Sequence, residues 1–317
     1  MQLDKLLMRA ARTTWRHRSL WALGLLATAG GLLFALFWRS MTLTRPTGGL
    51  QLDQVDPVLA MERLINPATL VGGVLLFFLA ILMVWLLSAI ADGALIVAVR
   101  GIEQGQPLQL SGSISAGIRL IGRFIGIDTI LFLPLFLLAL ALMLIGMGGL
   151  GGLVFAATRP GAQMGDLLFV IGLSTLASLP IALLMLVTGV IVFVLRSLAF
   201  RAAALEGLNT GQSIRRSWHL LRNKLLSITL LALVLWALRS IVGLPLRIAT
   251  LALIAAGLGQ FLLAASNPAQ SSGDSSLPLA IAGFMVALLS GLVAGVMHAY
   301  GSTSWTLAYE QWVDEPA

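Results

Sequence analysis

Five candidate functional residues are ionisable side chains within long apolar stretches of the sequence or, for Arg196, directly after one. A charge there is costly and therefore informative. They are Asp92, Asp128, Arg196, Arg239 and His298. A charged group at the centre of a bilayer costs about 2.5–3.5 kcal/mol on insertion scales, so such groups pair with one another or mark a path for protons, ions or headgroups. Two interpretations stay open: a polar cluster that binds a headgroup or carries protons, or separate structural partnerships. The structural interpretation is favoured, and Arg239 is expected to face the bundle interior, a partner or a water defect.

No familiar catalytic motif accompanies these residues. The sequence contains no HExxH, no CxxC and no Walker loop, no G-x-S-x-G nucleophile elbow, and no cysteine. Ser290 and His298 resemble the pair of a serine protease only loosely, because both lie on one predicted helix. Two of the three histidines, His17 and His219, belong to basic segments. We therefore predict no enzyme activity, no cofactor and no metal site.

The overall composition explains why ionisable groups are so few. Hydrophobic residues make up 58% of the 317 residues and charged residues only 10%, with a mean hydropathy of +0.97. Globular domains carry about 25% charged residues, so this composition excludes a water-soluble enzyme, a nucleic-acid-binding domain and a disordered chain. The net charge of +7 predicts no nucleic-acid partner, because the basic residues lie in particular loops. The sequence predicts an all-α integral membrane protein.

Six apolar stretches reach the length of about 20 residues that a helix needs to cross a bilayer. They cover residues 20–38, 68–99, 124–155, 167–195, 225–258 and 277–307. The first follows a basic leader and contains Ala27-Thr28-Ala29, which resembles a signal cleavage site, but its apolar run is too long for a signal peptide. We expect an uncleaved helix. The fifth either kinks or breaks at Gly243-Leu244-Pro245, and a kink is favoured.

The distribution of basic residues predicts the orientation of these spans. Fourteen of the 20 Lys and Arg residues fall on one side, in the N-terminal segment and in the loops after the second and fourth spans. Loops rich in Lys and Arg stay in the cytoplasm. Both termini are therefore predicted to be cytoplasmic.

An internal repeat of three units is also visible. The three even-numbered spans end near Glu103, Glu206 and Glu310. A basic segment precedes each odd-numbered span, and the three segments are residues 9–18, 113–123 and 213–224. The units are residues 1–103, 104–206 and 207–310. Since each unit crosses twice, the three share one topology, as parallel repeats do. The predicted architecture is three related helical hairpins, each preceded by a basic interfacial helix.

Each basic segment has the pattern of a helix that lies in the membrane interface. In the second segment Ile114, Gly117, Ile118 and Ile121 form one apolar face. The opposite faces carry cations that are expected to contact anionic phospholipid headgroups. These candidate contacts are Arg12, Arg16, Arg18, Arg119, Arg123, Arg215, Arg216, Arg222 and Lys224.

Two sequence features resemble a known family. They are the end of the second span, Gly93-Ala94-Leu95-x-x-Ala98-Val99, and the segment Ser213-Ile214-Arg215-Arg216-Ser217-Trp218. With six spans and basic segments before the odd helices, the chain resembles the membrane domain of bacterial glycerophosphoryl diester phosphodiesterases and related six-helix bacterial proteins. In the phosphodiesterases this domain accompanies a soluble catalytic barrel, which we do not expect here, so no catalytic residue is transferred. The resemblance implies a bacterial inner-membrane domain.

Three functions compete for this architecture. The favoured hypothesis is a non-enzymatic membrane module that engages anionic lipid, or a membrane partner of unpredicted identity, through its basic segments. The alternative is a transporter or channel with a polar path between the repeats, lined by Asp92, Asp128, Arg239 and His298. An intramembrane lipid-modifying enzyme would need a clustered nucleophile, base or metal set that the sequence does not offer.

Overall fold

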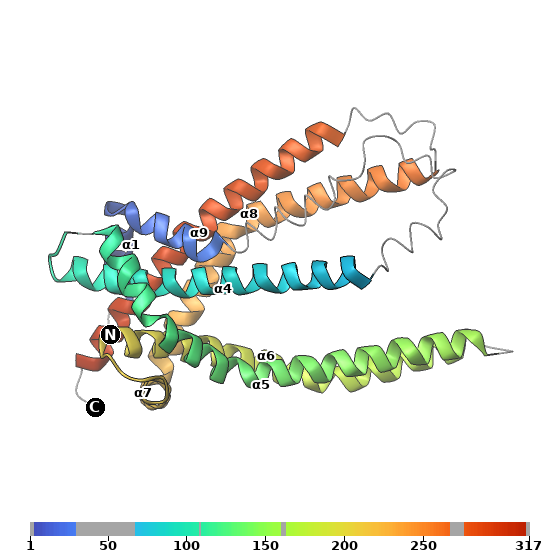
Figure 1. The fold of residues 1–317 in the computed structure, drawn as a ribbon, viewed down its shortest axis with the longest axis horizontal. Helices are drawn as coiled ribbons and strands as arrows, with labels where there is room; N and C mark the ends of the chain where they lie inside the picture. The colour runs from blue at the N-terminus through green and yellow to red at the C-terminus, as the bar shows by residue number, and fades with distance from the viewer. Residues whose placement is uncertain (1–2, 30–66, 108, 160–162, 267–275, 315–317) are drawn as a thin grey trace. The chain divides into compact units, whose positions relative to one another are not determined.

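The computed structural model describes the chain except for residues 1–2, 30–66, 108, 160–162, 267–275 and 315–317. Every regular element in the described part is an α-helix. The labelled helices are α1 (Leu3–Arg16), α4 (Pro67–Glu103), α5 (Leu110–Thr158), α6 (Met164–Leu205), α7 (Thr210–Asn223), α8 (Leu225–Ser266) and α9 (Ser276–Asp314) (Figure 1). A further apolar helix, Ser19–Ala29, follows α1.

Five helices of the described chain are long and apolar enough to cross a membrane. Their apolar parts are Leu75–Glu103, Leu110–Thr158, Met164–Leu205, Leu225–Gly257 and Ile281–Asp314. They correspond to the second to sixth predicted spans. Of the first predicted span, the described part is the shorter helix Ser19–Ala29, and residues 30–38 lie outside the described residues. An all-α protein with several membrane-spanning helices is therefore confirmed, and the sixth span stays a prediction.

The structure excludes one alternative for the fifth span and corrects one predicted helix. The alternative of a break at Pro245 fails because α8 continues through that residue; membrane helices tolerate proline when neighbouring groups satisfy the freed carbonyl. The second basic segment is also not a separate helix, since α5 runs unbroken from Leu110 into its apolar part. No strong stop occurs there, whereas Asn223, a weak helix former, ends α7 just before α8 begins.

The chain packs as two compact units. The first comprises Met1–Ile121 and Thr229–Glu315, and the second comprises Gly122–Ile228 with the last two residues. Within the first unit, α1 and α4 both pack against α9. Its core joins the helix Ser19–Ala29 to the carboxyl-terminal halves of α4 and α9, through Leu20, Leu23, Ala94, Leu95, Ala98, Val99 and Ala299.

The second unit contains an antiparallel hairpin of α5 and α6. Phe124 stacks on Phe200 with ring centroids 4.0 Å apart. Farther along, a Cβ placed on Gly149 would lie 3.0 Å from the Cβ of Ser174, and one on Gly152 would lie 3.1 Å from Cγ1 of Val170. Residue numbers rise on α5 while they fall by nearly the same amount on α6, so one register holds along the hairpin. α7 packs against α6.

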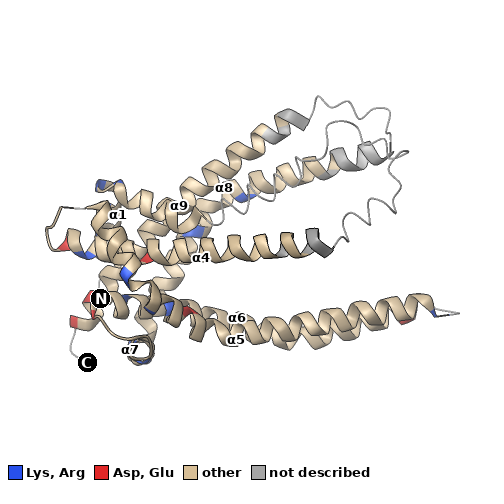
Figure 2. Cartoon of the chain, viewed as in Figure 1, with Lys and Arg blue, Asp and Glu red and all other residues tan. Residues whose placement is uncertain are grey.

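The buried side chains and most charges lie at one end of the long helices in each unit. In α4 the side chains from Leu75 to Met83 are exposed, whereas those from Ala91 to Leu95 are buried. α6 shows the same change, with its buried residues running from Val192 to Ala203. Figure 2 shows the charged residues concentrated toward this carboxyl-terminal end of α4, α6 and α9. The opposite halves present apolar surface, as a lipid environment requires.

Glycine lets two helices of the first unit approach at backbone distance. A Cβ added to Gly24 would overlap the carbonyl oxygen of Gly295, and one added to Gly295 would lie 2.8 Å from Leu25 side-chain atoms. By contrast, a Cβ on Gly301, also in α9, would meet nothing within 4 Å. Small residues are the means by which membrane helices obtain close packing.

This difference predicts opposite effects for the same chemical change. Gly24→Ala forces the helix Ser19–Ala29 away from α9 and should destabilise the protein by about 1–3 kcal/mol, the usual cost of overpacking. Gly301→Ala should be neutral or stabilising by about 0.5–1 kcal/mol, because alanine favours the helix. Thermal unfolding of the detergent-solubilised protein measures both. Equal melting temperatures for the two variants would contradict the packing.

Candidate functional site

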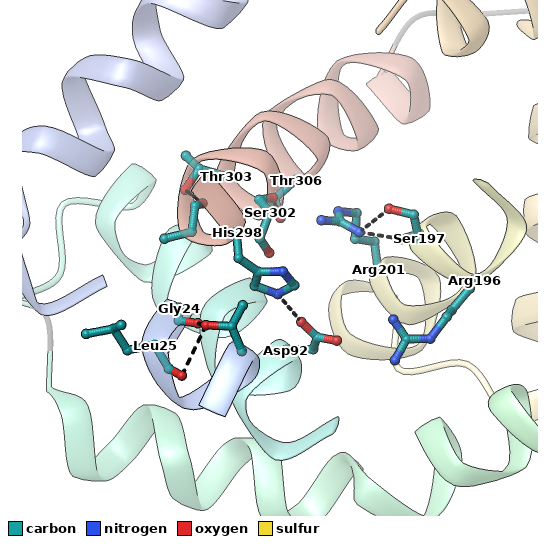
Figure 3. A network of polar contacts seen from close by, with 12 residues as sticks. Gly24, Leu25, Asp92, Arg196, Ser197, Arg201, His298, Ser302, Thr303 and Thr306 are labelled. Carbon is teal, nitrogen blue, oxygen red and sulfur yellow. Dashed lines mark hydrogen bonds and ion pairs between the residues drawn. The ribbon is translucent and has the colours of Figure 1, made fainter. Parts of the chain in front are cut away.

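The first polar site joins α4 to α9 inside the first unit. His298 Nε2 lies 2.7 Å from Asp92 Oδ1, and Figure 3 shows the imidazole directed at the carboxylate. Asp92 is 6% exposed. A carboxylate with so little access to water needs a hydrogen-bonding partner, and His298 supplies one from a helix more than 200 residues away. The pair therefore fastens the two helices together.

A run of hydroxyl residues follows His298 on α9, and the sequence analysis did not anticipate it. Ser302, Thr303, Ser304 and Thr306 are all buried. Thr303 donates to the carbonyl of Ala299 at 2.8 Å, and Thr306 donates to that of Ser302 at 2.9 Å. The hydroxyls of Thr303, Ser304 and Thr306 therefore donate within their own helix, and their small side chains allow close packing. In the sequence, these residues are visible as a run of small polar residues inside the apolar stretch 277–307.

This run forms the surface on which α1 rests. The hydroxyl oxygens of Thr14 and Thr303 are 3.3 Å apart. One turn earlier on α9, the Tyr300 hydroxyl donates to the carbonyl of Leu7 at 3.4 Å. The N-terminal basic helix therefore lies beside the carboxyl-terminal half of α9.

The second polar site joins α5 to α6 inside the second unit. Arg196 donates to both carboxylate oxygens of Asp128, from Nε to Oδ1 at 2.7 Å and from Nη2 to Oδ2 at 3.2 Å. The guanidinium carbon lies 4.3 Å from the ring centroid of Phe200. Asp128 is 1% exposed. A bidentate pair between arginine and a carboxylate has fixed geometry, so this contact sets the register of the hairpin.

The five predicted intramembrane residues thus fall into distinct environments. Asp92 and His298 meet in the first unit, and Asp128 and Arg196 meet in the second. Arg239 is exposed on α8, which leaves a partner or a water defect as its expected surroundings. Arg201 is buried near the end of α6 and donates to the Ser197 hydroxyl at 3.0 Å (Figure 3). Both acidic groups have a partner on another helix, which favours the structural interpretation.

The basic segments are the third feature, and one arginine of each contacts the end of a neighbouring helix. Arg9 of α1 forms an ion pair with Glu103 at the end of α4. Arg216 of α7 lies 3.4 Å from Glu206, which caps α6. Arg123 of α5 donates to the carbonyl of Gly207 at 3.0 Å. Arg123 and Arg216, both candidate lipid contacts, are therefore engaged with the protein itself.

Small residues seat each basic segment against its neighbour. The buried pairs are Ala10 and Thr14 in α1, Ser113 and Gly117 in α5, and Ser213 and Ser217 in α7. A Cβ on Gly117 would overlap the carbonyl of Ile90 in α4. The predicted apolar face of the second segment therefore does not lie wholly against lipid, because Gly117 is buried in protein while Ile118 is 52% exposed.

The opposite faces of these segments carry exposed cations. Six of the nine predicted lipid contacts are exposed: Arg12, Arg16, Arg18, Arg119, Arg215 and Arg222. Lys224, between α7 and α8, is partly buried. Among the described residues no group of three or more His, Cys, Asp or Glu side chains is placed to hold a metal ion.

Comparison with known proteins provides no relative. The chain matches no protein-family model, and no significant match is found among curated proteins or solved structures. The geometry of the pairs and of the basic segments is therefore the basis for any functional assignment.

Breaking the Asp128–Arg196 pair is expected to destabilise the protein more than removing both of its members. Arg196→Leu leaves a buried carboxyl group without its cation and should destabilise the protein by about 3–5 kcal/mol. The double variant Asp128→Leu with Arg196→Leu should recover most of that loss, because neither charge remains buried. Thermal unfolding followed by circular dichroism in detergent measures all three.

Arg239→Leu serves as the control for this experiment, since it removes an exposed arginine from α8. Its effect should be small. The structural role of the pair would be disproved by a double variant that is as unstable as Arg196→Leu alone.

Proposed function

We propose that this is a six-span bacterial inner-membrane protein that acts as a non-enzymatic module engaging anionic lipid headgroups. The observation that carries the proposal is the common design of the three basic segments. In each, small residues face the protein and one arginine is engaged with a carboxylate or carbonyl at a helix end, while at least one other arginine is exposed and has no such assigned contact. A segment seated in this way offers its outward charges to a ligand without having to reorganise.

The position of α1 supports the sixth span and the shared location of the termini. α1 packs beside the carboxyl-terminal half of α9, through the contacts of Leu7 with Tyr300 and of Thr14 with Thr303. A chain that begins and ends at the same end of its bundle must cross an even number of times. Five candidate spans are described, so one more crossing is required. We assign it to the span that begins with Ser19–Ala29, and we place both termini in the cytoplasm by the positive-inside rule.

Recurrent docking supports the threefold repeat. The segment of the second repeat packs on α4, the even-numbered helix of the first repeat, and α7 of the third packs on α6 of the second. The first segment, α1, packs on α9, which belongs to the third. Each basic segment therefore docks on the even-numbered helix of the preceding repeat in cyclic order. Charge patterning alone does not explain this recurrence.

The resemblance to the membrane domain of glycerophosphoryl diester phosphodiesterases fits the same proposal. On this proposal, the protein is related to that membrane domain and acts by binding lipid. We carry over neither esterase activity nor any catalytic residue, and we propose no cofactor.

The topology is tested by reporter fusions. Green fluorescent protein attached to either terminus should fluoresce, because both termini remain in the cytoplasm, whereas alkaline phosphatase at the same positions should be inactive. Alkaline phosphatase inserted after residue 50 should be active. Opposite results at the two termini would remove the sixth span and with it the proposed repeat.

Lipid preference is tested on protein reconstituted in mixed vesicles of phosphatidylglycerol and phosphatidylcholine. Energy transfer to labelled lipid should show enrichment of phosphatidylglycerol around the protein, and added salt should weaken it. Replacing Arg12, Arg16, Arg119, Arg215 and Arg222 by Gln should abolish most of the enrichment, since each cation near an anionic surface contributes about 1 kcal/mol.

The control replaces Arg239 and Arg247, two exposed arginines of α8 outside the basic segments, and should leave the enrichment nearly unchanged. Full enrichment after loss of the five segment arginines would contradict the proposed function.

A further inference from the structure

One face of α7 combines a tryptophan with two arginines. Arg215, Trp218 and Arg222 are spaced three and four residues apart, so they form a single stripe on the helix. Arg215 and Arg222 are exposed, and Trp218 is 47% exposed. Ser213, Ser217 and Leu220 are buried on the opposite face. The stripe therefore points away from the protein.

The same arrangement occurs on α1. Arg12, Trp15 and Arg16 are exposed, with Trp15 at 67%, while Ala10 and Thr14 on the opposite face are buried. Three positions correspond at a spacing of 203 residues: Arg12 matches Arg215, Trp15 matches Trp218, and Thr14 matches Ser217. The second arginine of each stripe does not correspond, because Arg16 matches His219 and Arg222 matches Ser19. Two helices that belong to different compact units thus present Arg-x-x-Trp with the same backing.

Large exposed aromatic side chains require an explanation on a helix that has a buried face available. Tryptophan is enriched where a bilayer meets water, because its ring is apolar and its N–H is polar. Arginine offers a planar fork that binds phosphate through two hydrogen bonds. A tryptophan one turn from an arginine therefore matches a lipid molecule at two points, the glycerol region and the phosphodiester.

We propose that the Arg-x-x-Trp stripes of α1 and α7 are two equivalent binding sites for the phosphodiester headgroup of an anionic glycerophospholipid. This inference rests on the proposed function and narrows it from a charged surface to two sites. The arginine binds the phosphate while the tryptophan ring inserts beside the glycerol backbone. The seat of small residues holds each stripe in place before the lipid arrives.

The second repeat lacks this site. At the positions that match Arg12 and Trp15 it has Ser115 and Ile118, and only Arg119 remains. Its exposed face thus has an apolar residue and a cation, but Ser115 replaces the arginine that would bind the phosphate one turn before the ring. We expect two retained lipids per chain, and not three.

The chain offers matched controls for both residue types. Arg216 is adjacent to Arg215 but is directed to Glu206, so Arg216→Gln removes the same charge without touching the stripe. Trp236 is exposed in the apolar part of α8, one turn before the exposed Arg239 and outside both basic segments, so Trp236→Ala removes an exposed ring without altering either stripe. Trp218→Tyr keeps an interfacial aromatic ring at the site.

The test is titration of the full-length protein with phosphatidylglycerol in a neutral detergent, followed by native mass spectrometry. The unaltered protein should bind two lipids tightly. Arg215→Gln should weaken one of them by about tenfold, the loss expected when a charge-assisted hydrogen bond disappears. Trp218→Ala should weaken the same site, because no ring then inserts beside the glycerol backbone. Arg216→Gln, Trp236→Ala and Trp218→Tyr should retain both.

Two further arms identify the ligand. Soluble glycerol phosphate in excess should not displace the lipid; displacement would mean a site for free phosphate esters and would overturn the lipid assignment. Equal losses from Arg215→Gln and Arg216→Gln, or full binding by Trp218→Ala, would overturn the stripe while leaving a general preference for anionic lipid intact. Absence of any preference for phosphatidylglycerol in the unaltered protein would instead refute the proposed function itself.

Discussion

The cost of removing a charge from water organises the packing of this protein. Asp128 and Asp92 are nearly inaccessible to solvent, and each obtains its partner from a neighbouring helix, Arg196 in one case and His298 in the other. Apolar side chains have no strong preference between lipid and another helix. Polar partnerships and close contacts of small residues therefore select which helices meet within each unit.

The length and position of the helices could be predicted from the sequence because hydropathy acts locally. The spans that became α4, α5, α6, α8 and α9 follow from runs of apolar residues. The ends of α4 at Glu103 and of α6 beside Glu206 agree with the acidic positions noted in the repeat. α9, however, continues past Glu310 to Asp314, since no helix-breaking residue occurs there.

The partnerships and orientations could not be predicted, because they depend on tertiary contacts. Nothing in the spacing of Asp92, Asp128, Arg196 and His298 states which acid meets which base. The amphipathic pattern of the basic segments predicts an apolar face and a cationic face. It does not predict whether the apolar face contacts lipid or another helix. Gly117 was assigned to a lipid-facing surface, whereas its lack of a side chain is what brings α5 against the backbone of α4.

Arginines of the basic segments also contact the carboxyl-terminal ends of neighbouring helices. The last carbonyls of a helix lack intrahelical partners and carry partial negative charge. A nearby arginine both donates hydrogen bonds to these carbonyls and compensates their charge. Arg123 donates to the carbonyl of Gly207, whose φ of +71° ends α6 in a conformation that glycine tolerates. Arg9 and Arg216 neutralise the acidic groups at the ends of α4 and α6. With those acids compensated by Arg9 and Arg216, further arginines of the segments, among them Arg12, Arg119 and Arg215, remain exposed, as the proposed contact with anionic headgroups requires.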